Sequence, residues 1–324
     1  MLHGRRGWGK VLGVVITGER LGPLRARNSE VLTVAAKRKI DDVTVSEATP
    51  AAGSEASQSL YADPSIYDIL YTPGTAAEID ALERIERTLA TGRLREDRLW
   101  FEPACGTGRC LRVAARRGRR VAGFDREAPM LAYARKRLAT CAGASARRLF
   151  EAELADFAEP AGRAGLKPGT VDFAFMTVNS LRHLESDRDM KAHFAQVADL
   201  LRPGALYVVG ISLTDYDWLW PDEDTWAGTR GRCKVSQVIN WLPPEPGTPR
   251  GRLERALSHL TVTRPGGAVD LDDAYDLRCY DEKQWRKLVG ASALEHAGSF
   301  NALGKPLPPG TWPYQLEALR KPLA

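Results

Sequence analysis

Cysteine is scarce in this 324-residue chain, and long apolar runs are absent. The five cysteines, Cys105, Cys110, Cys141, Cys233 and Cys279, include no C-x-x-C pair, so neither a disulfide scaffold nor a thiolate metal site is expected. This usage is typical of a protein kept in the reducing cytoplasm. No apolar stretch reaches the roughly 18 residues of a membrane-spanning helix. We therefore expect a cytoplasmic protein with no bound metal and no membrane partner.

An excess of one charge is also lacking outside the first 58 residues. The chain has 46 Lys and Arg against 41 Asp and Glu. Residues 1–58 hold nine of the basic and six of the acidic side chains, which leaves 37 against 35 for the rest. Nucleic-acid enzymes usually present a basic face, whereas the cluster Arg116, Arg117, Arg119 and Arg120 is typical of the last turn of a helix. No nucleic-acid partner is expected.

Residues 1–58 show no helix or strand periodicity. The apolar run Val11–Ile16 follows basic residues but is short and has no Ala-x-Ala site close behind it, which disfavours a signal peptide. We expect a disordered leader. A misassigned start and a transit peptide for organellar import stay open as alternatives.

The most informative stretch is Leu99–Arg109, with the sequence LWFEPACGTGR. A bulky apolar run fit for a buried parallel strand ends in Glu102, and a turn containing Gly106 and Gly108 leads into a helix. Glycines let the backbone approach a ligand closely, and the first N–H groups of the helix face an anionic group. Asp125 ends the next strand and is placed to accept both hydroxyls of a ribose.

The acid before the glycines separates two cofactor classes. A dinucleotide fingerprint needs a third glycine, where this chain has Leu111, and Glu102 would repel a pyrophosphate. A nicotinamide oxidoreductase is therefore disfavoured. The segment Glu102–Gly108 resembles the first motif of class I (Rossmann-like) S-adenosylmethionine-dependent methyltransferases, acid-x-(Gly/Ala)-x-Gly-x-Gly, with Ala104 in place of the commoner glycine. The resemblance covers roughly residues 61–320 and implies S-adenosylmethionine as cofactor.

The resemblance also implies roles for individual residues. The cofactor-binding positions that it indicates are Tyr71, Glu102, Ala104, Gly106, Gly108, Arg109, Asp125, Arg126, Asp156, Phe157 and Asn179. Asp156 would bind the adenine amino group, with the N–H of Phe157 reaching the ring, although an Asp here is equally typical of a turn. The segment Tyr67–Tyr71 would lie over the cofactor as part of a lid. Aromatic packing against the first helix explains these tyrosines equally well.

The periodicity predicts an α/β fold with a doubly wound, seven-stranded sheet whose last strand is antiparallel. We expect strands at 99–102, 121–125, 147–152, 171–176, 205–211 and 314–319, and helices at 75–89, 110–115, 127–138 and 185–201. Thr75–Glu78 is a capping box, residues 202–204 stop the 185–201 helix, and Asp281 caps a last helix. The domains would be a core at 59–212, an insertion at 213–280 and a completion of the sheet at 281–324.

The insertion combines an acidic, Trp-rich loop at Asp215–Trp226 with β-like runs near 234–241, 257–263 and 269–280. In the small-molecule branch of the family, an antiparallel β flap at this place shapes the acceptor pocket. A dimerisation sheet is the alternative, so the chain is expected to be a monomer or a homodimer.

The loop after the fourth strand, Asn179–Leu184, indicates the acceptor. It lacks the Pro-Pro-aromatic and Pro-Cys signatures of DNA methyltransferases and resembles the loop of amino-sugar N,N-dimethyltransferases and glycine-type N-methyltransferases. We expect N-methylation of a small molecule, with O-methylation second and a non-catalytic cofactor-binding regulator third. His183 is the expected acid–base or acceptor-orienting residue. His193 lies within the 185–201 helix and is expected in the covering layer.

Overall fold

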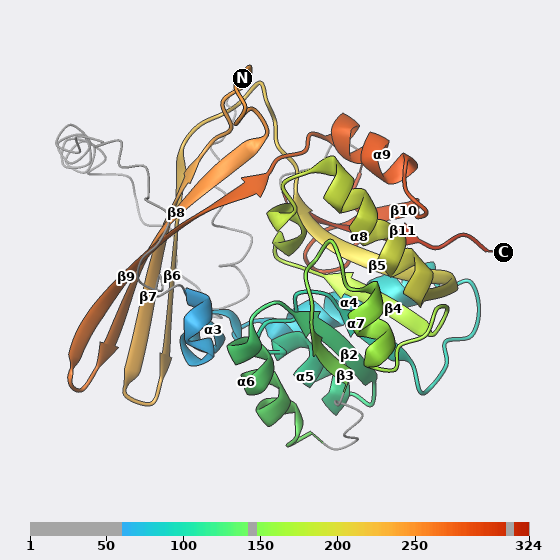
Figure 1. Ribbon diagram of the computed structural model, residues 1–324, viewed down its shortest axis with the longest axis horizontal. Coiled ribbons are helices and arrows are strands. Elements are labelled where there is room, and N and C mark those ends of the chain that lie inside the picture. Colours follow the sequence, from blue (N-terminus) through green and yellow to red (C-terminus); the bar gives the residue numbers. More distant parts are fainter. Residues whose placement is uncertain (1–59, 142–147, 309–313, 324) are drawn as a thin grey trace, which may run out of the picture. The chain divides into compact units, whose positions relative to one another are not determined.

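A mixed seven-stranded sheet organises the residues that the computed structural model describes, which are 60–141, 148–308 and 314–323 (Figure 1). The expectation for residues 1–58 lies outside this range. The strands are β1 (Leu99–Glu102), β2 (Arg120–Asp125), β3 (Arg148–Glu151), β4 (Val171–Met176), β5 (Leu201–Ser212), β10 (Glu295–Phe300) and β11 (Tyr314–Arg320). Their order is β10-β11-β5-β4-β1-β2-β3, with β1 to β5 parallel and β11 antiparallel to both neighbours. The expected fold class is confirmed.

Helices cover both faces of this sheet. On one face, α4 (Thr75–Leu89), α5 (Arg109–Arg116) and α6 (Ala128–Leu138) pack on Trp100 and Phe173. On the other, α7 (Ala158–Arg163), α8 (Asp187–Leu200) and α9 (Glu282–Gly290) pack on Phe101 and Phe124. Because side chains alternate along a strand, neighbouring bulky residues such as Trp100 and Phe101 fill opposite layers. All four residues of β1 are buried, as a parallel strand covered on both faces requires.

Three local expectations were wrong. Thr75 does not cap α4: the cap position is Gly74, with a φ of 82°, and Glu78 instead pairs with Arg109. Residues 202–204 belong to β5, because Arg202 pairs with Asp172 and the N–H of Gly204 donates to the carbonyl of Lys321. β10 was not anticipated, since EHAGSF lacks a clear apolar alternation. The capping box at Asp281 is present as expected.

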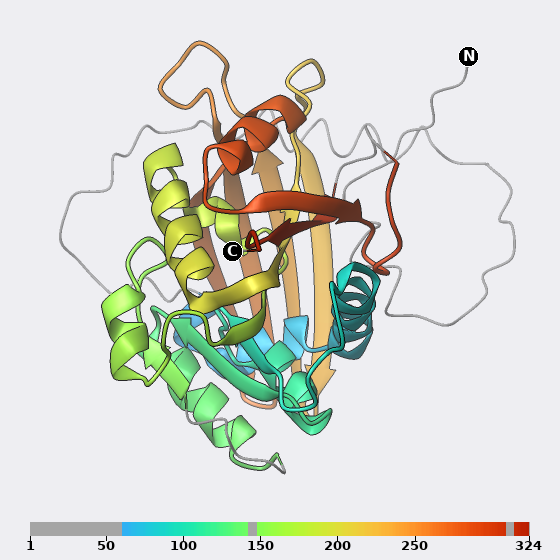
Figure 2. The same cartoon turned by 90° about the vertical axis from the view of Figure 1, so that its right-hand side faces the viewer.

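The insertion forms a separate antiparallel sheet of four strands in chain order. These are β6 (Asp222–Arg230), β7 (Cys233–Leu242), β8 (Leu253–Arg264) and β9 (Gly267–Arg278). The last three match the expected β-like runs, whereas β6 begins inside the segment expected to be a loop. Its sequence DEDTWAGTR has too few apolar residues to show a strand period. Figure 2 shows these long strands extending behind the seven-stranded sheet.

Helix α3 (Pro64–Tyr71) connects the two sheets. Its apolar residues Ile66, Ile69 and Leu70 form a cluster with residues of β7 and β8. Gly228 of β6 lies so close to α3 that an added Cβ would approach the carbonyl oxygen of Ile69 to 2.6 Å. The antiparallel sheet is therefore packed tightly on α3, which in turn contacts α6 of the core. Among the described residues, no helix combines the length and apolar character needed to cross a membrane.

Candidate active site

The turn after β1 has a strained backbone. Ala104, Gly106 and Gly108 have φ values of 49°, 52° and 67°. Positive φ is easy for glycine and uncommon for other residues, so Ala104 is held there by its surroundings. The N–H of Cys105 donates to the carbonyl of Phe124 at 2.8 Å, which ties the turn to β2. The turn is thus preorganised beside the carboxyl end of the sheet.

Two carboxylates border this turn. Glu102 is 6% exposed, its Oε2 has no hydrogen-bond partner among the described residues, and burial raises its pKa well above the ordinary value. Asp125 accepts the N–H of Gly106 at 2.7 Å and the N–H of Glu127 at 3.0 Å, one on each oxygen. Burial raises the pKa of Asp125 as well. Since a carboxylate oxygen has two acceptor sites, both residues keep capacity for a donor from a ligand.

Tyrosines of α3 and the segment before it lie over the turn. The ring centroids of Tyr67 and Tyr71 are 4.6 Å apart, and those of Tyr61 and Tyr67 are 6.0 Å apart. The ring of Tyr67 would be 3.7 Å from a Cβ placed on Gly106. Tyr71 donates from its hydroxyl to Gln237 of β7 at 3.0 Å. The neighbouring, tilted rings of Tyr67 and Tyr71 thus contact the glycine turn and the antiparallel sheet respectively, and the lid function of these tyrosines stays a prediction.

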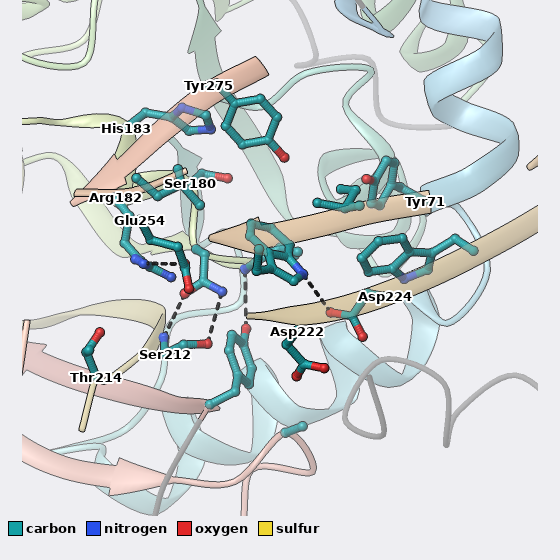
Figure 3. A pocket seen from close by; sticks show the side chains of 18 of the residues that line it. Tyr71, Ser180, Arg182, His183, Ser212, Thr214, Asp222, Asp224, Glu254 and Tyr275 are labelled. Carbon is teal, nitrogen blue, oxygen red and sulfur yellow. Dashed lines mark hydrogen bonds and ion pairs between the residues drawn. The ribbon is translucent and has the colours of Figure 1, made fainter. Parts of the chain in front are cut away.

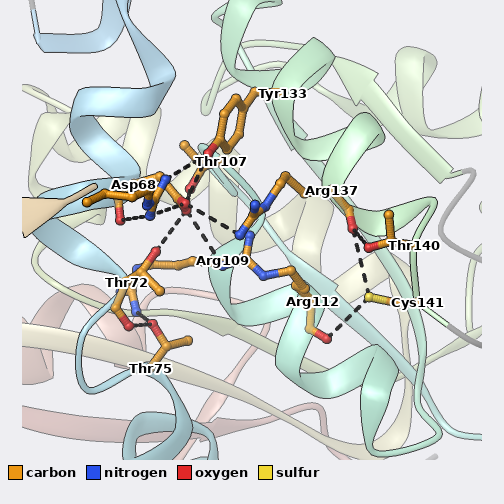
Figure 4. A network of polar contacts seen from close by, with 11 residues as sticks. Asp68, Thr72, Thr75, Thr107, Arg109, Arg112, Tyr133, Arg137, Thr140 and Cys141 are labelled. Atoms are coloured by element: carbon orange, nitrogen blue, oxygen red, sulfur yellow. Dashed lines mark hydrogen bonds and ion pairs between the residues drawn. The ribbon is translucent and has the colours of Figure 1, made fainter. Parts of the chain in front are cut away.

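Asp68 of α3 is fully buried at the centre of a network of polar contacts, and it was not singled out from the sequence (Figure 4). Its carboxylate accepts hydrogen bonds from Thr107 of the glycine turn at 3.2 Å, Tyr133 of α6 at 3.1 Å and Arg230 of β6 at 2.8 Å. The guanidinium of Arg112 lies 3.7 Å away. Burial alone would raise the pKa of Asp68, but hydrogen bonds from Thr72 and Arg230 and the charges of Arg112 and Arg230 lower it below the ordinary value. One carboxylate therefore links α3, the turn, α6 and β6.

The loop after β4 is also strained. Val178 and Asn179 have φ values of 58° and 62°, which is rare for a β-branched residue such as valine. The Asn179 amide accepts the N–H of Ser212 at 2.6 Å and donates to the Ser212 hydroxyl at 3.0 Å, and the N–H of Val178 donates to the hydroxyl of Tyr314. Strain held by surrounding bonds is often found at functional sites. These bonds fix the start of the short helix η2 (Ser180–His183).

His183 ends that helix, is exposed, and lies beside Tyr275 of β9. Its ring centroid is 5.4 Å from that of Tyr275, and its pKa is lowered to about 4, first by the surrounding protein and then by the cations of Arg126 and Arg182. His193 is different: it is fully buried, with Nδ1 and Nε2 each 2.8 Å from an oxygen, the carbonyl of Leu154 and the hydroxyl of Tyr207. His193 is a packing residue, as expected.

A cavity of about 260 Å³ lies between the loop after β4 and the antiparallel sheet (Figure 3). Of the residues predicted from the sequence, Tyr71, Arg109, Asn179 and His183 line it. Five further lining residues come from the antiparallel sheet and were not singled out individually from the sequence, although the first two lie in the predicted acidic segment Asp215–Trp226: Asp222, Asp224, Trp241, Glu254 and Tyr275. Trp218 and Trp220 also line it while 70% and 68% exposed. The insertion thus supplies one wall of the cavity.

Other predicted cofactor residues have partners within the protein. Arg109 forms a two-point ion pair with Glu78, one contact of which is 3.1 Å. The N–H of Phe157, expected to reach adenine, donates to Gln196 at 2.7 Å, and its ring is buried. Asp156 is exposed, and exposed Arg126 pairs with Glu127. The roles expected for these four residues stay predictions.

Comparisons with known proteins agree with this geometry. Residues 101–204 match the sequence profile of a family described as a methyltransferase domain. A relative from Streptomyces venezuelae, the dTDP-3-amino-3,4,6-trideoxy-alpha-D-glucopyranose N,N-dimethyltransferase, is 25% identical over 239 residues, which are 71% of this chain and 88% of the relative.

Solved structures share the fold. DesVI of Streptomyces venezuelae has a TM-score of 0.59 at 21% identity, over 80% of this chain and 98% of its own. CalS10 of Micromonospora echinaspora, an amino pentose methyltransferase solved with S-adenosylmethionine bound, has a TM-score of 0.56 at 17% identity, over 83% of this chain and 99% of its own. With the domain match, the expected enzyme class and cofactor are confirmed: the chain is a methyltransferase that depends on S-adenosylmethionine.

Proposed function

We propose that this S-adenosylmethionine-dependent methyltransferase methylates an amino nitrogen of a small molecule, and that the acceptor belongs to the amino-sugar class. The carrying observation is the cavity, where the weak base His183 faces a lining of carboxylate and aromatic side chains. Its volume of about 260 Å³ is slightly below the roughly 300–1,000 Å³ of small-molecule sites, which suits a small acceptor. The relative named for N,N-dimethylation of an amino sugar supports the same acceptor class.

The glycine turn and the end of β2 would hold the cofactor. The unpartnered Oε2 of buried Glu102 fits the cofactor's ammonium group, because a buried carboxylate oxygen needs a donor. Asp125 would accept the ribose hydroxyls with the acceptor sites that its two backbone bonds leave open. When bound, the cofactor supplies a methyl group on sulfonium, which an amine lone pair takes in line as the S–C bond breaks and its electrons stay on sulfur.

His183 is assigned an orienting role in this mechanism. With a pKa of about 4 its imidazole is neutral at neutral pH, and its unprotonated ring nitrogen accepts a hydrogen bond. An alkylammonium has a pKa of roughly 8–10, so transfer of its proton to this ring is unfavourable, and the amine gives its proton to water before it attacks. His183 then accepts from an N–H of the neutral amine and directs the lone pair toward the methyl group.

The same weak basicity favours nitrogen over oxygen as the acceptor atom. A hydroxyl must lose its proton as it attacks, which requires a competent general base. The surrounding protein and the nearby cations of Arg126 and Arg182 lower the pKa of His183, and burial raises those of the Tyr71 and Tyr275 phenols, so these phenols stay protonated. A neutral amine needs no base before attack. O-methylation is therefore the second assignment.

The test is methyl transfer from labelled S-adenosylmethionine to a panel of amino sugars, each paired with the analogue that has a hydroxyl in place of the amino group. We expect the label on nitrogen, located by NMR, and none in the hydroxyl analogues. Label on oxygen would overturn the nitrogen assignment. Tight S-adenosylhomocysteine binding with no turnover of any acceptor would support a non-catalytic regulator instead.

A variant of His183 tests its role. His183→Ala should lower kcat by roughly 2–10-fold, the effect of losing one hydrogen bond of about 0.5–1.5 kcal/mol, while S-adenosylhomocysteine affinity stays within a few-fold. His183→Asn, which keeps a hydrogen-bond acceptor, should recover part of the rate. His259→Ala is the matched control, because His259 lies on the outer part of β8 with half of its side chain exposed. Wild-type turnover in His183→Ala would remove this residue from the mechanism.

A further inference from the structure

Asp224 of β6 is a buried carboxylate with an unused oxygen beside the cavity. The residue is 8% exposed, and its Oδ2 accepts the indole N–H of Trp241 at 3.0 Å. Its Oδ1 has no hydrogen-bond partner among the described residues. Leaving a buried polar atom without a hydrogen bond is unfavourable, and more so for a charged group. The orphaned oxygen therefore indicates a donor that arrives with a ligand.

Because side chains alternate between the two faces of a β-strand, Asp224 lies on the face of β6 that lines the cavity. Asp222, Asp224 and Trp226 alternate along β6 and all line the cavity, whereas Glu223 and Thr225 are exposed and do not. On the paired strand, Trp241 lines it as well. A cavity wall that combines a carboxylate with the indoles of Trp226 and Trp241 is suited to an organic cation, because the faces of tryptophan rings attract positive charge within about 6 Å.

The excess of carboxylates in the cavity lining also favours a cationic ligand. Its described lining contains five carboxylates, Glu78, Asp215, Asp222, Asp224 and Glu254, and two guanidiniums. Both guanidiniums are paired with lining carboxylates, Arg109 with Glu78 and Arg182 with Glu254. Burial raises the pKa of Asp224, and the charges of Asp222 and Glu254 raise it further. Such a lining attracts a cation and repels a diphosphate.

We propose that Asp224, with the indoles of Trp226 and Trp241, binds a second, protonated amino group of the acceptor. The acceptor is then a free amino sugar with at least two amino groups, rather than a sugar carried on a nucleoside diphosphate. The inference rests on the proposed N-methylation for the nature of the acceptor. Figure 3 shows Asp224 and His183 well apart in the cavity, so one amine is held as a cation while the other meets His183 as a neutral nucleophile.

Binding without turnover tests this subsite. Calorimetry on the full chain saturated with S-adenosylhomocysteine would use three probes: the methyl glycosides of 2,6-diamino-2,6-dideoxyglucose and of 2-amino-2-deoxyglucose, and thymidine diphosphate glucose. We expect the diamine to bind at least ten-fold more tightly than the monoamine and the nucleotide sugar to bind most weakly. Tightest binding of the nucleotide sugar, equal binding of the two amines, or no binding of the diamine would overturn the proposal.

Two substitutions test whether Asp224 is responsible for the tighter binding of the diamine. Asp224→Asn should abolish the advantage of the diamine and leave S-adenosylhomocysteine affinity unchanged, since the glycine turn is untouched. Glu223→Gln removes the same charge one residue away on the opposite face of β6 and should keep the advantage. A diamine advantage that persists in Asp224→Asn would overturn the assignment to Asp224. Because no methyl is transferred, a methyl later found on oxygen would count against the proposed function and leave this result standing.

Discussion

Replacing Asp68 by Asn should destabilise the protein strongly, because among the described residues this carboxylate is the only one that forms an ion pair with the buried guanidinium of Arg112. Asp68 is fully buried, and the Arg112 side chain is 5% exposed, 3.7 Å away, with Nη1 already lacking a partner among the described residues. Removing one member of a buried ion pair typically costs about 3–5 kcal/mol, since the other charge stays desolvated.

The remaining partners of Asp68 add little to this loss of stability. The side chains of Arg230 and Arg137 are 42% and 43% exposed, so each can turn to water, and exposed pairs contribute roughly 0–1 kcal/mol. Thr72 and Thr107 can still donate to the oxygen of an asparagine. We therefore expect Asp68→Asn to lower the free energy of unfolding by about 3–5 kcal/mol, or the melting temperature by roughly 6–20 °C.

Urea denaturation followed by circular dichroism and by tryptophan fluorescence measures this loss. Asp63→Asn is the matched control: Asp63 caps the same helix, is only partly buried, and asparagine caps a helix equally well. Asp68→Asn should also weaken S-adenosylhomocysteine binding, because Thr107 of the glycine turn loses an ionised partner. A loss no larger than that of Asp63→Asn would refute the view that Asp68 fastens α3 to the turn and to β6.

Three further outcomes are expected. Asp125→Ala should weaken cofactor binding by roughly 1.5–3 kcal/mol, as measured by calorimetry, and unchanged affinity would remove Asp125 from the site. Trp220→Ala should raise the acceptor KM more than it changes cofactor affinity, since Trp220 lines the cavity away from the glycine turn; dissociation of an oligomer with turnover preserved would instead favour the dimerisation sheet. The pKa of buried His193 is lowered to about 4 from an unfolded value near 6.5, so the unfolded state binds its proton first and the free energy of unfolding should fall as pH decreases from 6.5 to 4. Urea titrations at pH 7.5, 6.0 and 5.0 should show this slope, and His193→Gln should reduce it.

The glycine turn could be predicted because its chemistry is local. Glu102, Gly106 and Gly108 lie within seven residues, and a bulky strand and a helix flank them in the sequence. The same holds for β4 and α8, whose apolar periods match their buried faces. β6 was not predicted as a strand. Its residues that line the cavity are Asp222, Asp224 and Trp226, and this pattern resembles an acidic loop.

The remaining features of the site depend on contacts between distant segments. Asp68 meets Arg230 across 162 residues, and Arg182 meets Glu254 across 72. A sequence window shows each of these side chains only as a charge on a helix or strand, and most such charges are solvated. Their burial follows from the packing of the antiparallel sheet on α3 and on the loop after β4. The insertion that contributes carboxylates to the proposed acceptor cavity therefore also buries these ion pairs. Mutations in β6 should then couple stability to acceptor selectivity more strongly than mutations in β3.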